Sequence, residues 1–156
     1  MRTFKISLLA LLAMGFFASC ERSSPSPAVV PENNDLILGS WTYNKVTFKR
    51  DVSAHQEDYT DLYKGDGLEV FTDSMRMVIR NPEQPAEKLG TWKLRTITAT
   101  YTGRAEQVKV LHGVLTNQTT QEAEAVYWEN IRFGEEKMIY WILEDGGTYE
   151  YELLRD

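Results

Sequence analysis

Apolar and polar residues alternate in short runs from residue 38 onward, which is the pattern of β-strands buried on one face only. The clearest run is 96–102, where threonines alternate with Ile97, Ala99 and Tyr101. Glycine, proline and asparagine recur between the runs and indicate turns. The strands that this pattern predicts are 38–49, 67–72, 74–80, 89–95, 97–102, 107–115, 123–133, 137–143 and 147–155.

Short strands separated by turns predict an all-β fold, because strands with one wet face belong to antiparallel rather than parallel sheets. We expect an antiparallel up-and-down β-barrel of about eight to nine strands. One run, 138–143, departs from the pattern because it is apolar on both faces. Its outer face is expected to be covered by a loop or a partner subunit, or to lie where the barrel folds over itself.

The longest gap between predicted strands, 51–66, is expected to hold one short helix. Ser53 and Gln56 have the spacing of a capping box, in which each side chain satisfies a backbone amide of the other residue. An apolar stripe of helical spacing follows, formed by Tyr59, Leu62 and Tyr63. Such a helix would lie over the barrel mouth, either as the gate of a ligand cavity or as a surface helix over a filled barrel.

The first predicted strand opens with Gly39 and Trp41, a Gly-x-Trp that resembles the motif at the closed end of the lipocalin barrel. In lipocalins an arginine from the last strand packs across this tryptophan, and Arg155 occupies the matching place. The resemblance implies a barrel floor built from these three residues, with a cation–π contact of about 0.5–2 kcal/mol. Gly90 and Trp92 repeat the motif, but the first copy is favoured because it opens the domain, as the family pattern requires.

A barrel of about eight strands is either just filled by its side chains or has room for one small ligand. Aromatic residues make up 12% of the chain, and large side chains serve both arrangements. A cavity would be walled by inward strand positions and by the predicted helix. The candidate wall residues are Tyr43, Tyr59, Tyr63, Met75, Met77, Tyr101, Trp128 and Tyr140.

Residues 1–19 have the composition of an export signal, with two basic residues before an apolar run and small residues at its end. The apolar run is shorter than the roughly 20 residues that a membrane-spanning helix needs. Phe17-Ala18-Ser19-Cys20 resembles the lipobox of bacterial lipoproteins, although Phe17 stands where leucine is usual. We therefore expect Cys20 to carry lipid chains that anchor the mature protein to a membrane.

Residues 20–35 are rich in proline and serine and are expected to form a flexible tether. Residues 36–156 then make one domain of ordinary size, with a core that needs no disulfide. Loss of the signal removes Arg2 and Lys5, which changes the formal charge from −6 to −8. Such a surface repels phosphates, so no nucleic-acid partner is expected, and membrane contact is expected through the lipid alone.

No residue set matches a catalytic motif, a phosphate-binding loop or a paired metal-ligand spacing, so no enzyme activity, metal or cofactor is expected. The chain has two histidines, and His112 is expected to be a hydrogen-bonded wall residue of a strand. The acidic residues of 51–66 are interpreted as a solvated helix face. Two pairs of carboxylates are interpreted as outward charged strand faces: Glu122 with Glu124, and Glu150 with Glu152.

Taken together, these features resemble the lipocalin-like lipoproteins of Gram-negative envelopes. The resemblance implies a lipid-anchored outer-membrane protein whose barrel binds a small hydrophobic ligand. It is expected to face the periplasm, because no acidic run follows Cys20. The alternative is a filled barrel that acts through its surface, as an inhibitor of an envelope enzyme or an accessory subunit of an outer-membrane assembly, with a protein partner or a second copy at 138–143. An interior cavity of about 300 Å³ or more would favour the ligand-binding hypothesis.

Overall fold

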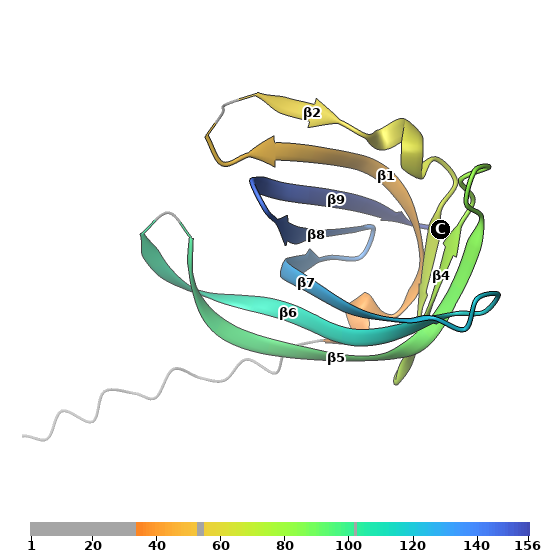
Figure 1. The fold of residues 1–156 in the computed structure, drawn as a ribbon. Coiled ribbons are helices and arrows are strands. Elements are labelled where there is room, and N and C mark those ends of the chain that lie inside the picture. Colours follow the sequence, from red (N-terminus) through yellow and green to blue (C-terminus); the bar gives the residue numbers. More distant parts are fainter. Residues whose placement is uncertain (1–33, 53–54, 102) are drawn as a thin grey trace, which may run out of the picture. The chain divides into compact units, whose positions relative to one another are not determined.

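The alternating runs fold into nine β-strands and two short 3-10 helices (Figure 1). The computed structural model describes residues 34–52, 55–101 and 103–156. These residues belong to one compact unit, Asn33–Asp156. The elements are η1 (Asn34–Ile37), β1 (Gly39–Arg50), β2 (Gln56–Asp58), η2 (Thr60–Tyr63), β3 (Gly67–Val70), β4 (Ser74–Ile79), β5 (Ala86–Tyr101), β6 (Arg104–Asn117), β7 (Ala123–Phe133), β8 (Lys137–Glu144) and β9 (Gly147–Arg155).

Eight of the strands, β1 and β3 to β9, form a closed antiparallel barrel in which each strand pairs with the next. The barrel closes where β1 pairs with β9, from Trp41 opposite Arg155 to Arg50 opposite Gly147. The extra strand, β2, pairs with the part of β1 that β3 leaves uncovered. The all-β, up-and-down barrel predicted from the alternation is therefore confirmed.

The longest strand, β5, replaces two of the predicted strands, 89–95 and 97–102, so the predicted break between them is wrong. Leu94 packs against the barrel core, whereas the partly buried Ile97 has the opposite parity along the strand. The parity of the buried residues changes at the same place in β6. Leu111 lies in the core, whereas Val108, which is opposite Ile97, is buried on the other face. The alternation of buried and exposed residues shifts by one position where the β5–β6 hairpin leaves the barrel wall. In the sequence this shift has the same pattern as a boundary between two strands, so two strands were predicted.

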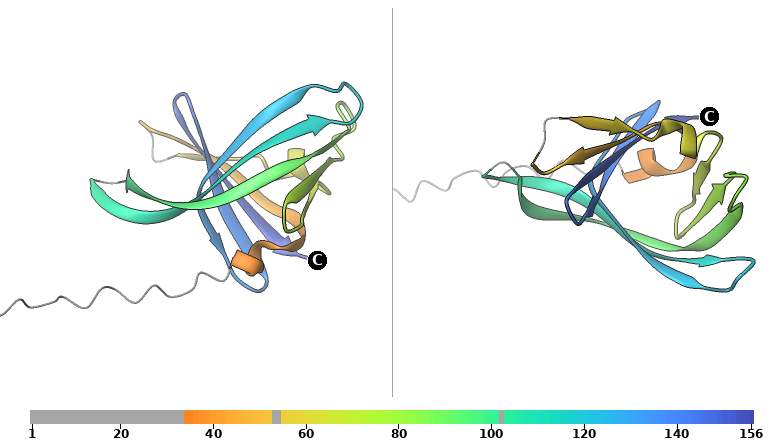
Figure 2. Two further views of the ribbon diagram at one scale, coloured as in Figure 1. Left: turned by 90° about the horizontal axis from the view of Figure 1, so that it is seen from below. Right: turned by 45° about the horizontal axis from the view of Figure 1, so that its top comes forward.

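The two ends of the barrel are built differently (Figure 2). One end, called the floor here, carries η1, the β3–β4 turn and the β7–β8 turn, whose Glu136 carbonyl accepts a hydrogen bond from the Arg155 amide at 2.9 Å. The other end, called the mouth, carries η2 and the β4–β5, β6–β7 and β8–β9 turns. The strands thus connect a capped end to an end lined by loops.

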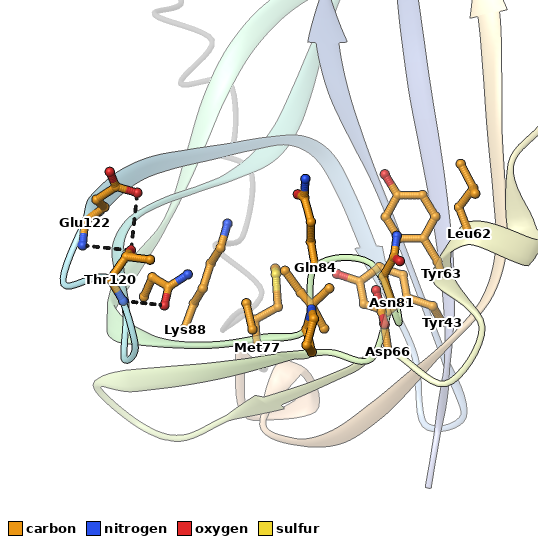
Figure 3. A pocket seen from close by; sticks show the side chains of 14 residues that line it. Tyr43, Leu62, Tyr63, Asp66, Met77, Asn81, Gln84, Lys88, Thr120 and Glu122 are labelled. Carbon is orange, nitrogen blue, oxygen red and sulfur yellow. Dashed lines mark hydrogen bonds between the residues drawn. The ribbon is translucent and has the colours of Figure 1, made fainter.

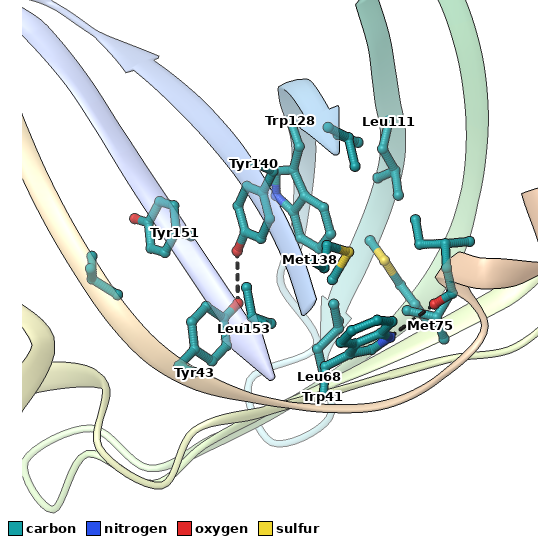
Figure 4. Packing of buried hydrophobic residues seen from close by; sticks show 14 of the residues in the cluster. Trp41, Tyr43, Leu68, Met75, Leu111, Trp128, Met138, Tyr140, Tyr151 and Leu153 are labelled. Carbon is teal, nitrogen blue, oxygen red and sulfur yellow. Dashed lines mark hydrogen bonds between the residues drawn. The ribbon is translucent and has the colours of Figure 1, made fainter. Parts of the chain in front are cut away.

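The core fills the floor half of the barrel (Figure 4). Trp41 is fully buried and its indole nitrogen donates to the Ile37 carbonyl of η1 at 2.9 Å. Trp128 stacks on Tyr140 with 4.2 Å between ring centroids. Each large side chain buried in this way contributes about 1.5–3 kcal/mol relative to an exposed position.

The 51–66 segment contains a short helix, as predicted, but it is η2, a single 3-10 turn. The capping-box prediction is wrong for Gln56, which lies in β2 and donates from its amide to the Thr47 hydroxyl at 2.7 Å. Ser53 lies outside the described residues. The stripe of Tyr59 and Tyr63 does pack against the core, so the apolar spacing identified the segment that folds back on the barrel.

The strand that is apolar on both faces, β8, has its outer face covered in part by polar side chains of its neighbours, and Leu143 on that face is 50% exposed. Met138 and Tyr140 point into the core, whereas Trp141 lies on the other face. The Trp141 indole nitrogen donates to Glu150 at 2.8 Å, and the Arg132 guanidinium lies 5.8 Å from its ring. Charged side chains of β7 and β9 therefore cover this tryptophan within the monomer.

The export signal 1–19, Cys20 and most of the tether lie outside the described residues. The described residues begin with η1 at Asn34, so the last two residues of the expected tether lie in this 3-10 helix. In the part of the chain that the structure describes, no helix is long and apolar enough to cross a membrane.

Candidate ligand-binding site

The floor brings together the three residues implied by the Gly-x-Trp resemblance. The Arg155 guanidinium lies 4.2 Å from the centroid of the Trp41 ring. It also donates to three backbone carbonyls, those of Leu36 at 2.6 Å, Leu38 at 2.8 Å and Glu135. A Cβ on Gly39, whose φ is +128°, would lie 2.5 Å from a guanidinium nitrogen. The floor is thus a plug that fixes η1 and the β7–β8 turn to the last strand.

The second Gly-x-Trp has a different environment. Trp92 is only partly buried, and its indole nitrogen donates to the Phe71 carbonyl at 2.9 Å and the Ser74 carbonyl at 3.0 Å. A Cβ on Gly90 would lie 1.7 Å from the Val114 carbonyl oxygen, so a glycine is required for β5 and β6 to approach there. Both Gly-x-Trp copies lie in β-strands, but only the first copy, Gly39 and Trp41, forms the floor.

A cavity of about 600 Å³ lies at the mouth (Figure 3). Its apolar lining comes from β1, η2, β4 and the start of β5: Tyr43, Leu62, Tyr63, Met77, Ile79, Pro85 and Ala86. Its polar lining comes from the loops and the ends of β5 and β6: Asp66, Asn81, Gln84, Lys88, Asn117, Thr120 and Glu122. The barrel is therefore filled at the floor and open at the mouth, with room for one small molecule.

Three of the predicted wall residues, Tyr43, Tyr63 and Met77, line this cavity. Three others were wrongly assigned to the wall, because they are almost fully buried in the core below it: Met75, Trp128 and Tyr140. The prediction failed because inward-pointing residues near the floor touch one another across the barrel and leave no free space.

The two remaining candidates belong to other parts of the fold. Tyr59 packs against the core from the loop before η2, and its hydroxyl donates to Glu57 at 2.8 Å. Tyr101 ends β5 opposite Arg104, at the far end of the strand from Ala86, which lines the cavity. The long β5–β6 hairpin carries Tyr101 away from the mouth.

A layer of tyrosines separates the filled floor from the cavity. The Tyr43 and Tyr140 hydroxyls are 2.8 Å apart, and those of Tyr63 and Tyr151 are 3.2 Å apart. Burial raises the pKa of Tyr43, Tyr140 and Tyr151, and a hydrogen bond with Tyr63 raises the pKa of Tyr151 further. These phenols stay neutral, and Tyr43 and Tyr63 are the two tyrosines of the layer that line the cavity.

Polar side chains on the β5–β7 side of the cavity were not predicted. Lys88 has the same parity as Gly90 and Trp92 along β5, so an inward lysine could have been found from the alternation. Its ammonium forms an ion pair with Glu124. The outward interpretation of Glu122 and Glu124 is wrong, because Glu122 lines the cavity and Glu124 lies opposite the buried Leu115.

The outward interpretation is correct for the second carboxylate pair, on β9. Glu150 binds the outer residue Trp141, as described above, and Glu152 accepts from the Asn44 amide at 2.8 Å on the outer face.

Asp66 is the buried charged group of the site, with 4% of its surface exposed. It follows η2 and precedes β3, and its backbone carbonyl accepts a hydrogen bond from the Tyr43 amide at 3.2 Å. Its side-chain Oδ1 accepts from the Arg80 amide at 2.6 Å. Burial raises the pKa of Asp66, although the hydrogen bond from the Arg80 amide and the Arg80 charge act in the opposite direction. The sequence showed Asp66 only as half of an Asp-Gly turn.

The geometry holds no recognisable catalytic or metal constellation within the described ranges. No group of three histidine, cysteine or carboxylate residues there is placed to hold a metal ion. His112 lies in the middle of β6 in the barrel wall, as predicted, and is exposed on the outer face, where its ring lies 4.6 Å from that of Tyr127. Comparison with known proteins gives no matching family model, no matching curated protein and no matching solved structure.

Proposed function

We propose that this protein is a lipid-anchored envelope protein whose barrel binds a small, partly hydrophobic ligand at the mouth. The observation that carries the proposal is the cavity of about 600 Å³ that opens at the mouth, a volume within the range of small-molecule sites. Tyr43, Tyr63 and Met77 supply its apolar wall. Burial of a ligand against such a wall supplies about 25 cal/mol per Å², so a few hundred Å² support micromolar binding after the cost of association.

Filling the cavity tests its role. Ala86→Trp places a large side chain in the lining, and we expect it to abolish the binding of N-phenyl-1-naphthylamine, a neutral fluorescent probe. Thr98→Trp is the matched control, because Thr98 is exposed on the β5–β6 hairpin. Equal binding by both variants would show that the cavity is not the binding site.

The envelope part of the proposal rests on the lipobox resemblance around Cys20. In a Gram-negative host, Cys20→Ser should lose the lipid mass and move to the aqueous phase in detergent extraction. Membrane association unchanged by this substitution would refute the lipid anchor. We expect the protein to face the periplasm, and degradation by protease added to intact cells would place it on the cell surface instead.

A second function, as an interaction module, is favoured by an exposed apolar stripe on the outer wall. Leu89, Val114 and Tyr127 are 43%, 50% and 41% exposed on the neighbouring strands β5, β6 and β7. Scattered apolar residues are normal on surfaces, but a contiguous stripe is typical of contact sites. Val114→Asp should abolish cross-linking to an envelope partner while leaving probe binding intact, and unchanged cross-linking would argue against this surface.

A further inference from the structure

The mouth cavity has a chemically distinct side, where Tyr43, Tyr63 and Asp66 come together (Figure 3). The centroids of the Tyr43 and Tyr63 rings are 5.8 Å apart. The Tyr43 amide donates a hydrogen bond to the Asp66 carbonyl, which fixes Asp66 next to β1. Both tyrosine hydroxyls are engaged by other tyrosines. The lining on this side thus consists of two phenol side chains and one carboxylate.

The Asp66 residue is 4% exposed, and its carboxylate has capacity for further hydrogen bonds. Among the described residues, its side chain receives one hydrogen bond, from the Arg80 amide to Oδ1. A carboxylate accepts several hydrogen bonds when it is ionised. Its pKa is raised by burial, which means that the folded protein solvates the charge less well than water does. A ligand that donates to Asp66 would supply the missing stabilisation.

The other charges of the cavity do not favour an anion. Lys88 is the lysine of the lining, and its ammonium is already paired with Glu124. Glu122 adds a second carboxylate on the far side, where it accepts a hydrogen bond from the Thr120 hydroxyl at 3.2 Å. Among the described lining residues, the carboxylates of Asp66 and Glu122 are thus the charged groups outside this ion pair. The Arg80 guanidinium, whose charge acts against the burial that raises the pKa of Asp66, lies outside the lining.

We propose that the ligand carries a protonated amine, which binds Asp66 beside the Tyr43 and Tyr63 rings while its apolar part lies against Met77. This proposal rests on the ligand-binding function proposed above and names the chemical class of the ligand. Aromatic rings attract ammonium groups through their negative faces, and an adjacent carboxylate adds a charge-assisted hydrogen bond. A metal cation is a poorer fit, because the described part of the chain places no group of three metal-ligating side chains together.

The test compares three probes that share a phenylalkyl chain and differ in their head group: 4-phenylbutylammonium, 4-phenylbutanol and 4-phenylbutanoate. Isothermal titration calorimetry with the full chain should give the tightest binding for the ammonium compound and the weakest for the carboxylate. Asp66→Asn should weaken binding of the ammonium compound about 10- to 100-fold, the range for a hydrogen bond between charged groups. Binding of the alcohol should change less than about twofold, because asparagine keeps the oxygen that accepts from the Arg80 amide.

The matched control is Asp61→Asn, which removes the same charge from an exposed position in η2 outside the cavity lining. It should leave all three affinities unchanged. An equal loss in both variants would mean that a general negative field attracts the ammonium compound, and would overturn direct contact with Asp66. Alcohol or carboxylate binding as tight as that of the ammonium compound would overturn the amine preference while leaving the ligand-binding function intact. Failure of all three probes to bind the unmodified chain would refute that function, and this inference with it.

Discussion

Replacement of Arg155 by alanine should destabilise the barrel far more than the loss of an ordinary surface arginine. The guanidinium lies 4.2 Å from the Trp41 ring centroid and donates to the carbonyls of Leu36, Leu38 and Glu135. Alanine would remove these contacts together, and it would release η1 and the β7–β8 turn from the last strand.

The expected size of the effect follows from these contacts. The cation–π contact is worth about 0.5–2 kcal/mol. Hydrogen bonds to charged groups contribute about 1.5–3 kcal/mol each when buried, but the carbonyls here lie in a partly exposed region, where water replaces much of the loss. We therefore expect Arg155→Ala to lower the free energy of unfolding by about 2–4 kcal/mol. Arg155→Lys should recover only part of this, because a single ammonium cannot match the planar fork of donors.

The assay is equilibrium urea unfolding followed by tryptophan fluorescence, with the midpoint compared at constant slope. Arg132→Ala is the matched control, because this guanidinium also lies over a tryptophan, at 5.8 Å from the Trp141 ring, but its side chain is 57% exposed. It should cost less than about 1 kcal/mol. In a Trp41→Leu background the cost of Arg155→Ala should fall by about 0.5–2 kcal/mol, the value of the cation–π contact. Equal costs for the two arginines, or additive effects of the double substitution, would refute the assigned role.

Three further predictions concern the wall, the tyrosine layer and the cavity. Gly90→Ala should lower the free energy of unfolding in urea by about 3 kcal/mol or more, because the new Cβ would lie 1.7 Å from the Val114 carbonyl oxygen. Gly134→Ala is the control and should be nearly neutral, because the nearest atom to its Cβ would be 4.0 Å away. Tyr140→Phe should cost about 1–2 kcal/mol because it leaves the buried Tyr43 hydroxyl without its partner at 2.8 Å, and a neutral effect would show that another group satisfies it. Asp66 has a raised pKa in the folded protein, so the folded state binds more protons than the unfolded state and stability falls as pH rises from the ordinary Asp pKa through the raised value. Asp66→Asn should remove this fall in a series of urea titrations across that pH range, and an unaltered pH profile would mean that Asp66 is not its source.

The alternation of the sequence determined much of the fold. It located seven of the strands to within three residues at each end, because a strand with one buried face carries a period of two that needs no tertiary information. It also pointed to the segment of η2 through Tyr59 and Tyr63. The merger of two predicted strands into β5 was missed because Ile97 lies out of phase with Leu94, and only the path of the β5–β6 hairpin out of the wall accounts for that change.

The tertiary structure alone decided which inward residues line a cavity. Met75 and Met77 have the same parity on β4, yet Met75 is fully buried in the core and Met77 faces the cavity. Alternation reports the face of a strand on which a residue lies, but it does not report the height of that residue along the barrel axis or the volume that the other strands place at that height. Alternation also could not place Asp66 and Glu122 in the cavity lining. Both residues lie in turns at the mouth, and the paths of these turns depend on how eight strands close around a filled floor.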